Sequence, residues 1–174
     1  MRRLLPLAPF ALLLAGCGLR PLYGGVDSPA RAALAGIELG PIEGQAGWLM
    51  SSALKDRLGA VDRATPRYRL DVRLDDSILG LGVRRDDTIT RERRTLRARY
   101  QLVELGSGSV VLDATAGSDA GIDVVSSEYA TIAAEQTALE RLSGIVADQI
   151  VARIALYASR EGKAPGAPAP ATTP

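Results

Sequence analysis

Hydrophobic and polar residues alternate most regularly in the segment that begins at Tyr68. Its apolar residues share one parity and are Tyr68, Leu70, Val72 and Leu74, while Arg and Asp fill the positions between them. A side-chain period of two predicts a strand with one buried face and one face in water.

Similar alternation predicts two further strands. One runs from about Thr88 to Leu105, and a turn at Gly106–Gly108 leads to the other, in which Val110 to Ala116 alternate. Polar and glycine-rich residues predict a loop over Gly80–Asp87 and a polar loop over Gly117–Ser127.

Two segments have the three- and four-residue spacing of amphipathic helices. Gln45–Leu58 places apolar residues four apart and is followed by Gly59. Ser127–Arg160 is longer, and its predicted buried stripe is Ile132, Leu139, Leu142, Val146, Ile150, Ile154 and Tyr157. Gly144 in its middle indicates close packing or a slight bend.

A short edge strand is predicted before the first helix, where Ile37, Leu39 and Ile42 alternate. The order is therefore strand, helix, three antiparallel strands, helix. We expect an α+β fold, a two-layer sandwich in which two helices pack on one face of a mixed four-stranded sheet.

The N-terminus has the pattern of a lipoprotein signal peptide. Arg2 and Arg3 precede a short apolar run, which ends in Leu14-Ala15-Gly16-Cys17. The run is shorter than the ~20 apolar residues that a membrane-spanning helix needs. We expect cleavage after residue 16 and lipidation of Cys17; the alternative is an ordinary secreted protein with an unpaired Cys by the cut site.

The other expected segments follow from composition. They are a lipidated tether over residues 17–31, an α/β domain over 32–161 and a disordered Pro/Ala-rich tail over 162–174.

The residues after the lipobox are Cys17-Gly18-Leu19-Arg20-Pro21-Leu22-Tyr23-Gly24. This order resembles the mature N-terminus of the LPS-assembly lipoprotein family (LptE), particularly its alphaproteobacterial type, with Leu19 in place of the usual aromatic. The family-motif residues are Gly18, Arg20, Pro21, Leu22, Tyr23 and Gly24. A departure is the apolar Trp48, near which family members often have a polar residue.

The resemblance implies a protein anchored by lipid to the outer membrane and facing the periplasm. It implies a plug for a β-barrel LPS-assembly protein of the LptD type, which assists insertion of lipopolysaccharide. It also implies the same two-layer fold, no enzymatic activity and no cofactor besides the covalent lipid on Cys17.

Composition disfavours catalysis, metal binding and nucleic-acid binding. The chain has no His, and its single Cys is the expected lipid site, so the common general base and zinc ligands are missing. Gly80-Leu81-Gly82 lacks the third glycine of a dinucleotide loop. The pairs Asp75-Asp76 and Asp86-Asp87 lack calcium-loop spacing. Net charge is +1, far from the strong basicity of a nucleic-acid binder.

A basic strip is the remaining candidate for chemistry. Seven Arg and three acidic residues lie between Arg84 and Arg99. Four of these Arg share the parity opposite to Leu96 and are Arg91, Arg93, Arg97 and Arg99, and the neighbouring strand adds Arg67, Arg69 and Arg73. Guanidinium groups bind phosphates of the lipid A type bidentately. The alternatives are a solvated strand face and contacts with acidic residues of the barrel lumen.

We therefore expect an LPS-assembly lipoprotein. The runner-up is an auxiliary lipoprotein of an ABC-type lipid transporter, and a periplasmic lipoprotein enzyme is disfavoured because His is missing.

Overall fold

A computed structural model gives the fold, and it describes residues 34, 36–58, 66–83 and 89–161. The expected signal peptide, the tether with Cys17 and the family motif, and the tail lie outside these residues. The elements in chain order are β1 (Ile37–Leu39), α3 (Gly44–Leu58), β2 (Tyr68–Val83), β3 (Ile89–Glu104), β4 (Val110–Asp123) and α4 (Glu128–Glu161).

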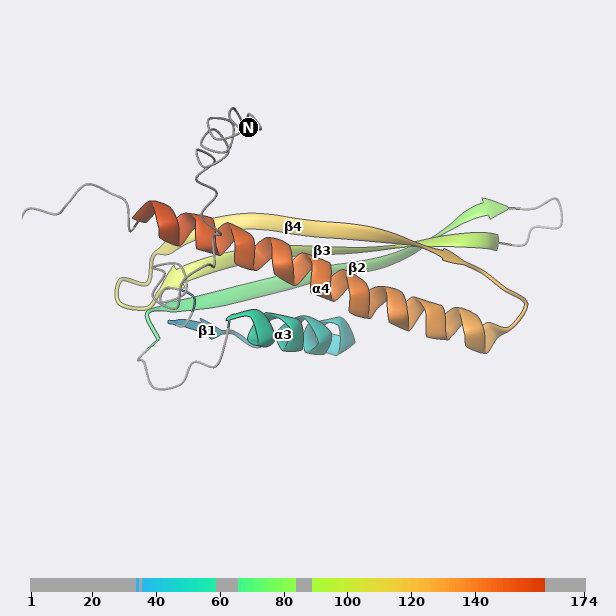
Figure 1. Cartoon of the computed structure of the whole chain (residues 1–174), viewed down its shortest axis with the longest axis horizontal. Helices are drawn as coiled ribbons and strands as arrows, with labels where there is room; N and C mark the ends of the chain where they lie inside the picture. The colour runs from blue at the N-terminus through green and yellow to red at the C-terminus, as the bar shows by residue number, and fades with distance from the viewer. Residues whose placement is uncertain (1–33, 35, 59–65, 84–88, 162–174) are drawn as a thin grey trace, which may run out of the picture.

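The strands form one sheet in the order β1-β2-β3-β4 (Figure 1). β1 is parallel to β2, and the other neighbours are antiparallel, so the sheet is mixed. Both helices contact the sheet, α3 at β1 and β2 and α4 at β3 and β4. The predicted α+β two-layer arrangement is confirmed.

One face of the sheet makes the core with the two helices. Leu70 on β2 and Leu96 and Tyr100 on β3 are among its most buried residues, and all have even numbers. Met50 and Leu54 of α3 meet them from the other layer. The strand parity predicted from the alternation is therefore the parity of the core.

α4 covers the longest part of this core. Within the described residues it is the one helix long and apolar enough to cross a membrane. Its stripe from Leu139 to Ile154 is buried in the domain. Ser127 caps its first turn, since the Ser127 hydroxyl accepts a hydrogen bond from the Ala130 N–H at 3.4 Å.

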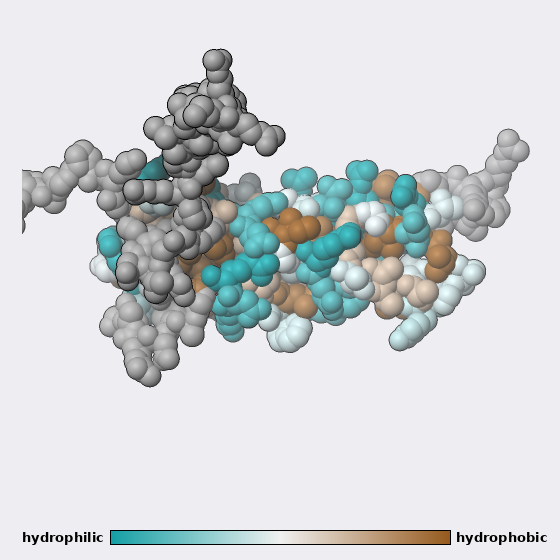
Figure 2. Space-filling view, viewed as in Figure 1, coloured by the Kyte–Doolittle hydropathy of each residue, from teal (hydrophilic) through white to brown (hydrophobic). Residues whose placement is uncertain are grey.

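The start of α4 differs from the predicted stripe. Ile132 is 56% exposed, and it lies near Tyr129 and Val125, which are exposed as well. Figure 2 shows apolar residues gathered on the surface at this end of the molecule. Helical spacing continues here, but Thr131, and not Ile132, occupies the buried position in this turn of α4.

Two predicted loops are partly strand. β2 continues through Gly80 to Val83, where its backbone pairs with β3, for example Leu81 with Arg91; residues 84–87 of the predicted loop lie outside the description. β4 continues from Gly117 to Asp123, where the predicted polar loop was wrong.

The glycines of β4 explain why that segment resembles a loop. A Cβ at Gly117 would lie 3.3 Å from Arg97 Cγ, so the missing side chain leaves room for the arginine. Ala120 and Ile122 keep the inward parity and are buried. Glycine and polar residues on the outer face therefore belong to a strand that accommodates long neighbours.

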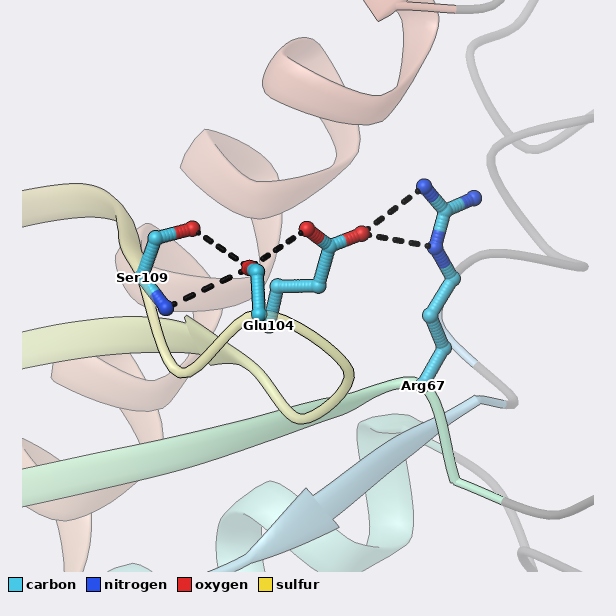
Figure 3. A network of polar contacts seen from close by, with 4 residues as sticks. Arg67, Glu104 and Ser109 are labelled. Carbon is cyan, nitrogen blue, oxygen red and sulfur yellow. Dashed lines mark hydrogen bonds and ion pairs between the residues drawn. The ribbon is translucent and has the colours of Figure 1, made fainter.

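The β3–β4 turn is held by a small polar network (Figure 3). Gly108 has φ of 69°, a conformation that favours glycine. The Arg67 guanidinium donates to the Glu104 carboxylate at 3.1 and 3.3 Å, and the Ser107 hydroxyl donates to its second oxygen at 2.9 Å. The Ser107 hydrogen bond, followed by that of Arg67, lowers the pKa of Glu104.

Candidate functional site

The outer face of the sheet is the side away from both helices, and the predicted arginine strip lies on it. Arg91, Arg93, Arg97 and Arg99 are all exposed and project from the odd positions of β3. The prediction that these four side chains point the same way is confirmed.

Three of the four arginines have carboxylate partners on β4. Arg91 Nε lies 3.1 Å from Asp123, Arg93 Nε lies 3.9 Å from Asp119, and Arg99 Nη2 lies 3.0 Å from Asp113. A ladder of cross-strand ion pairs therefore offsets much of the positive charge that the sequence of β3 alone displays.

Asp113 is the acid most firmly held in this ladder. Hydrogen bonds from Arg99 and from Gln101, whose amide lies 2.9 Å away, lower the pKa of the Asp113 carboxyl. The Arg99–Asp113 pair is therefore charged at neutral pH.

Arg97 and Arg73 differ from these neighbours. Among the residues that the structure describes, neither makes an ion pair or a hydrogen bond. They lie on adjacent strands, Arg73 opposite Arg99 and Arg97 opposite Asp75 in the β2–β3 register. Two guanidinium groups thus remain available at the centre of the outer face.

These two side chains line a hollow of about 550 Å³ on the outer face. Arg99, Asp75 and Asp119 are also part of its wall, together with residues of β4 around Gly117. A second hollow of about 630 Å³ shares Arg73 and Arg99 and reaches toward Pro41. The arrangement can bind an anion through bidentate guanidinium contacts, with hydroxyl and backbone groups of the adjacent strands nearby.

Arg94 belongs to the same run of arginines but points to the opposite face. Its Nε and Nη2 donate to the Asp76 carboxylate at 2.9 and 2.5 Å, and its Nη1 donates to the Glu135 carbonyl oxygen at 2.9 Å. Only 11% of the Arg94 side chain is exposed. Arg94 therefore joins the β2–β3 hairpin to α4.

Glu92 lies next to this pair on the inner face. Burial, and then the charge and hydrogen bond of Glu135, raise the pKa of the Glu92 carboxyl. Its Oε2 is buried and has no hydrogen-bond partner among the described residues. No motif in the sequence marks this cluster, although the even numbers of Asp76, Glu92 and Arg94 place them with the core positions.

Comparisons with known proteins address the family. A model of the family described as "LptE: Lipopolysaccharide-assembly" matches residues 34–154. No curated protein matches the chain.

Several solved structures share the fold. A protein from Caulobacter crescentus named a lipoprotein is 22% identical with a TM-score of 0.62, covering 75% of this chain and 96% of that one. A minor lipoprotein from Acinetobacter baumannii is 15% identical, with a TM-score of 0.56 and coverage of 69% and 90%. Rare lipoprotein B from Shewanella oneidensis is 10% identical, with a TM-score of 0.55 and coverage of 73% and 96%.

The family model begins three residues before β1, covers all four strands and α3, and ends within α4. The chain therefore belongs to the LptE lipopolysaccharide-assembly family, whose members are non-enzymatic assembly lipoproteins.

Proposed function

We propose that this protein plugs a β-barrel LPS translocon of the LptD type and assists insertion of lipopolysaccharide into the outer membrane. The family match over residues 34–154 carries this proposal. In this proposal the protein is of the alphaproteobacterial type, and a lipid on Cys17 anchors it to the outer membrane, facing the periplasm.

Within this function we assign the outer sheet face to the phosphates of lipopolysaccharide. Arg73 and Arg97 support the assignment because neither is neutralised by a neighbour among the described residues. The nearby ion pairs of Arg91, Arg93 and Arg99 are exposed and therefore weak, so a phosphate can compete with their carboxylates. A phosphate in the hollow would meet the unpaired guanidinium groups of Arg73 and Arg97 and the paired one of Arg99, with two carboxylates also in the wall.

The exposed apolar end of α4 supports contact with a partner. Val125, Tyr129 and Ile132 are exposed at the same end of the molecule, and clustered apolar residues of this kind mark protein or lipid contacts. The wall of a barrel and the acyl chains of lipopolysaccharide both have the chemistry to cover them.

A double variant, Arg73→Gln with Arg97→Gln, tests the phosphate assignment. Hydrogen bonds to charged groups contribute ~1.5–3 kcal/mol each, so LPS affinity should fall by about tenfold or more. Arg141→Gln with Arg160→Gln is the matched control, since it removes two exposed positive charges on α4. Added salt should also weaken LPS binding to the wild type, because exposed charges are screened over ~10 Å at 0.1 M.

Co-purification with the barrel from detergent-solubilised outer membranes tests the plug. We expect the wild type and the double variant to retain the barrel partner. A wild-type chain that brings down transporter components and no barrel would refute the plug. A quadruple Gln variant at Arg91, Arg93, Arg97 and Arg99 extends the test to the whole strip. If it binds LPS normally but loses the barrel, the strip is a plug interface; if both are normal, it is a solvated face.

A further inference from the structure

β4 is an edge strand, and its outer edge has an unusual length and composition. It has 14 residues, and among the described residues it pairs with β3 alone (Figure 1). Val110–Asp123 contains no Pro and no Lys, the residues that commonly protect an edge from further pairing. The edge is thus a template for another strand.

Gln149 of α4 occupies one position on this edge. The Gly117 N–H donates to Gln149 Oε1 at 3.2 Å, and Gln149 Nε2 donates to the Gly117 carbonyl oxygen at 3.4 Å. The side-chain amide thus makes both bonds that a neighbouring strand would make at one residue.

This contact also fixes the direction of the backbone. Since the N–H and C=O of Gly117 point away from β3, those of Thr115 and Asp119, two residues to either side, point outward as well. Within the described residues no side chain meets them as Gln149 meets Gly117.

A hollow of about 430 Å³ lies beside this edge. Thr115 and its neighbours on β4 line one side, Tyr100 lies behind them, and Gln149 and Arg153 of α4 line the other side. Arg153 is exposed and makes no ion pair or hydrogen bond with any described residue. The groove therefore combines outward backbone groups with one uncompensated positive charge.

We propose that the outer edge of β4 accepts an extended segment of a partner protein as a fifth strand, and that Arg153 selects a segment with a carboxylate opposite Ala114 or Ala116, the positions that face α4. Main-chain hydrogen bonds would supply affinity, and the side-chain contact would supply selectivity. A second copy of this chain fits less well. Its own β4 carboxylates already lie near Arg91, Arg93 and Arg99, so a contact with Arg153 would exchange one exposed ion pair for another with little gain.

The Gln149 amide competes with the proposed fifth strand for the backbone groups of Gly117. The amide must leave Gly117 before a strand pairs along the full edge. Replacement of Gln149 should therefore strengthen binding, whereas loss of a residue that directly holds a ligand weakens it.

A synthetic peptide of about ten residues is a suitable probe, with Thr and Val in alternation and one central Glu. N-methylation of every second residue blocks one of its edges, so it pairs through the other edge and does not aggregate. We expect saturable binding to the full-length protein by fluorescence anisotropy, with slower amide exchange at Thr115 and Asp119. A peptide methylated on both edges should not bind, and exchange of Glu for Lys should weaken binding by about tenfold.

Three variants locate the site. Arg153→Gln should bring the affinities for the Glu and Lys peptides together, whereas Arg141→Gln on the same helix should keep the preference. Gln149→Ala should bind the Glu peptide more tightly than the wild type. Thr115→Pro should abolish binding, since it removes an outward donor at an edge position where proline is tolerated.

Three results would overturn the proposal. The first is that the peptide methylated on both edges binds as tightly as the peptide methylated on one edge. The second is that the Glu peptide binds neither the wild type nor Gln149→Ala. The third is that Arg153→Gln still prefers the Glu peptide to the Lys peptide as strongly as the wild type does. If Thr115→Pro fails to fold by circular dichroism, the two methylated peptides still decide whether the backbone edge is used. The proposal does not rest on LPS binding, so the two are tested separately.

Discussion

Leu70→Ala is the most direct test of the two-layer fold. Leu70 is fully buried on β2, in register with Leu39 of β1 and Leu102 of β3. The substitution removes three carbon groups, worth ~0.8 kcal/mol each by transfer, and leaves a cavity that adds to the loss. We expect a decrease of about 3–4 kcal/mol in the free energy of unfolding.

The measurement is urea and thermal denaturation of the folded domain. For a domain of this size the loss corresponds to a fall of about 10 °C in melting temperature. Leu79→Ala is the matched control, because Leu79 is on the same strand with the outward parity and is 63% exposed. That variant, like Arg69→Ala, should change stability by less than about 0.5 kcal/mol. Comparable losses in Leu70→Ala and Leu79→Ala would refute the assignment of the two faces.

Three further predictions concern other parts of the chain. Burial and Glu135 raise the pKa of Glu92, so the wild type loses stability as pH rises through that raised value. In urea denaturation, Glu92→Gln should have the same free energy of unfolding as the wild type near pH 4 and a higher one at neutral pH. Gly47→Ala should destabilise α3, since the new Cβ would lie 2.5 Å from the Ile42 carbonyl oxygen. By contrast, a Cβ at Gly144 would meet only ordinary contacts, so Gly144→Ala should stabilise α4 by ~0.5–1 kcal/mol. Cys17→Ser should abolish incorporation of labelled palmitate, and a lipidated serine variant would show that the anchor lies elsewhere.

The sequence was sufficient to predict the elements in which the spacing of apolar residues within one strand or helix shows the buried side. Alternation at Tyr68–Leu74 and spacing at Leu139–Ile154 reflect which side of a single element is buried. Both are fixed by the chain's own periodicity, so the order of elements and the two layers were predictable.

The ends of the long strands were not predictable from local pattern. Gly80 and Gly117 favour turns in isolation, but both segments continue as strands because they pair with β3. Ile132 shows the opposite error: its spacing fits the core stripe of α4, yet Thr131 is the buried residue of that turn and Ile132 is exposed.

The sequence predicted on which face of the sheet the arginines lie, but not which of them are paired with carboxylates. The parity of β3 places Arg97 and Arg99 on one face, as the structure does. Whether each arginine is neutralised depends on the register with β4, which sets Asp113 near Arg99 and leaves Arg97 opposite Gly117. That register results from the whole hairpin, and alternation within one strand does not specify it.

In the part of the chain that the structure describes, no helix covers the outer face of the sheet, and this has a consequence for how the protein evolves. Even positions of β2 and β3 carry stability, so most of their substitutions are removed by selection on folding. Odd positions contribute little to stability and are free to change with whatever the face contacts. Divergence among relatives should therefore have a period of two along the strands, and any odd position that resists change marks a binding contact.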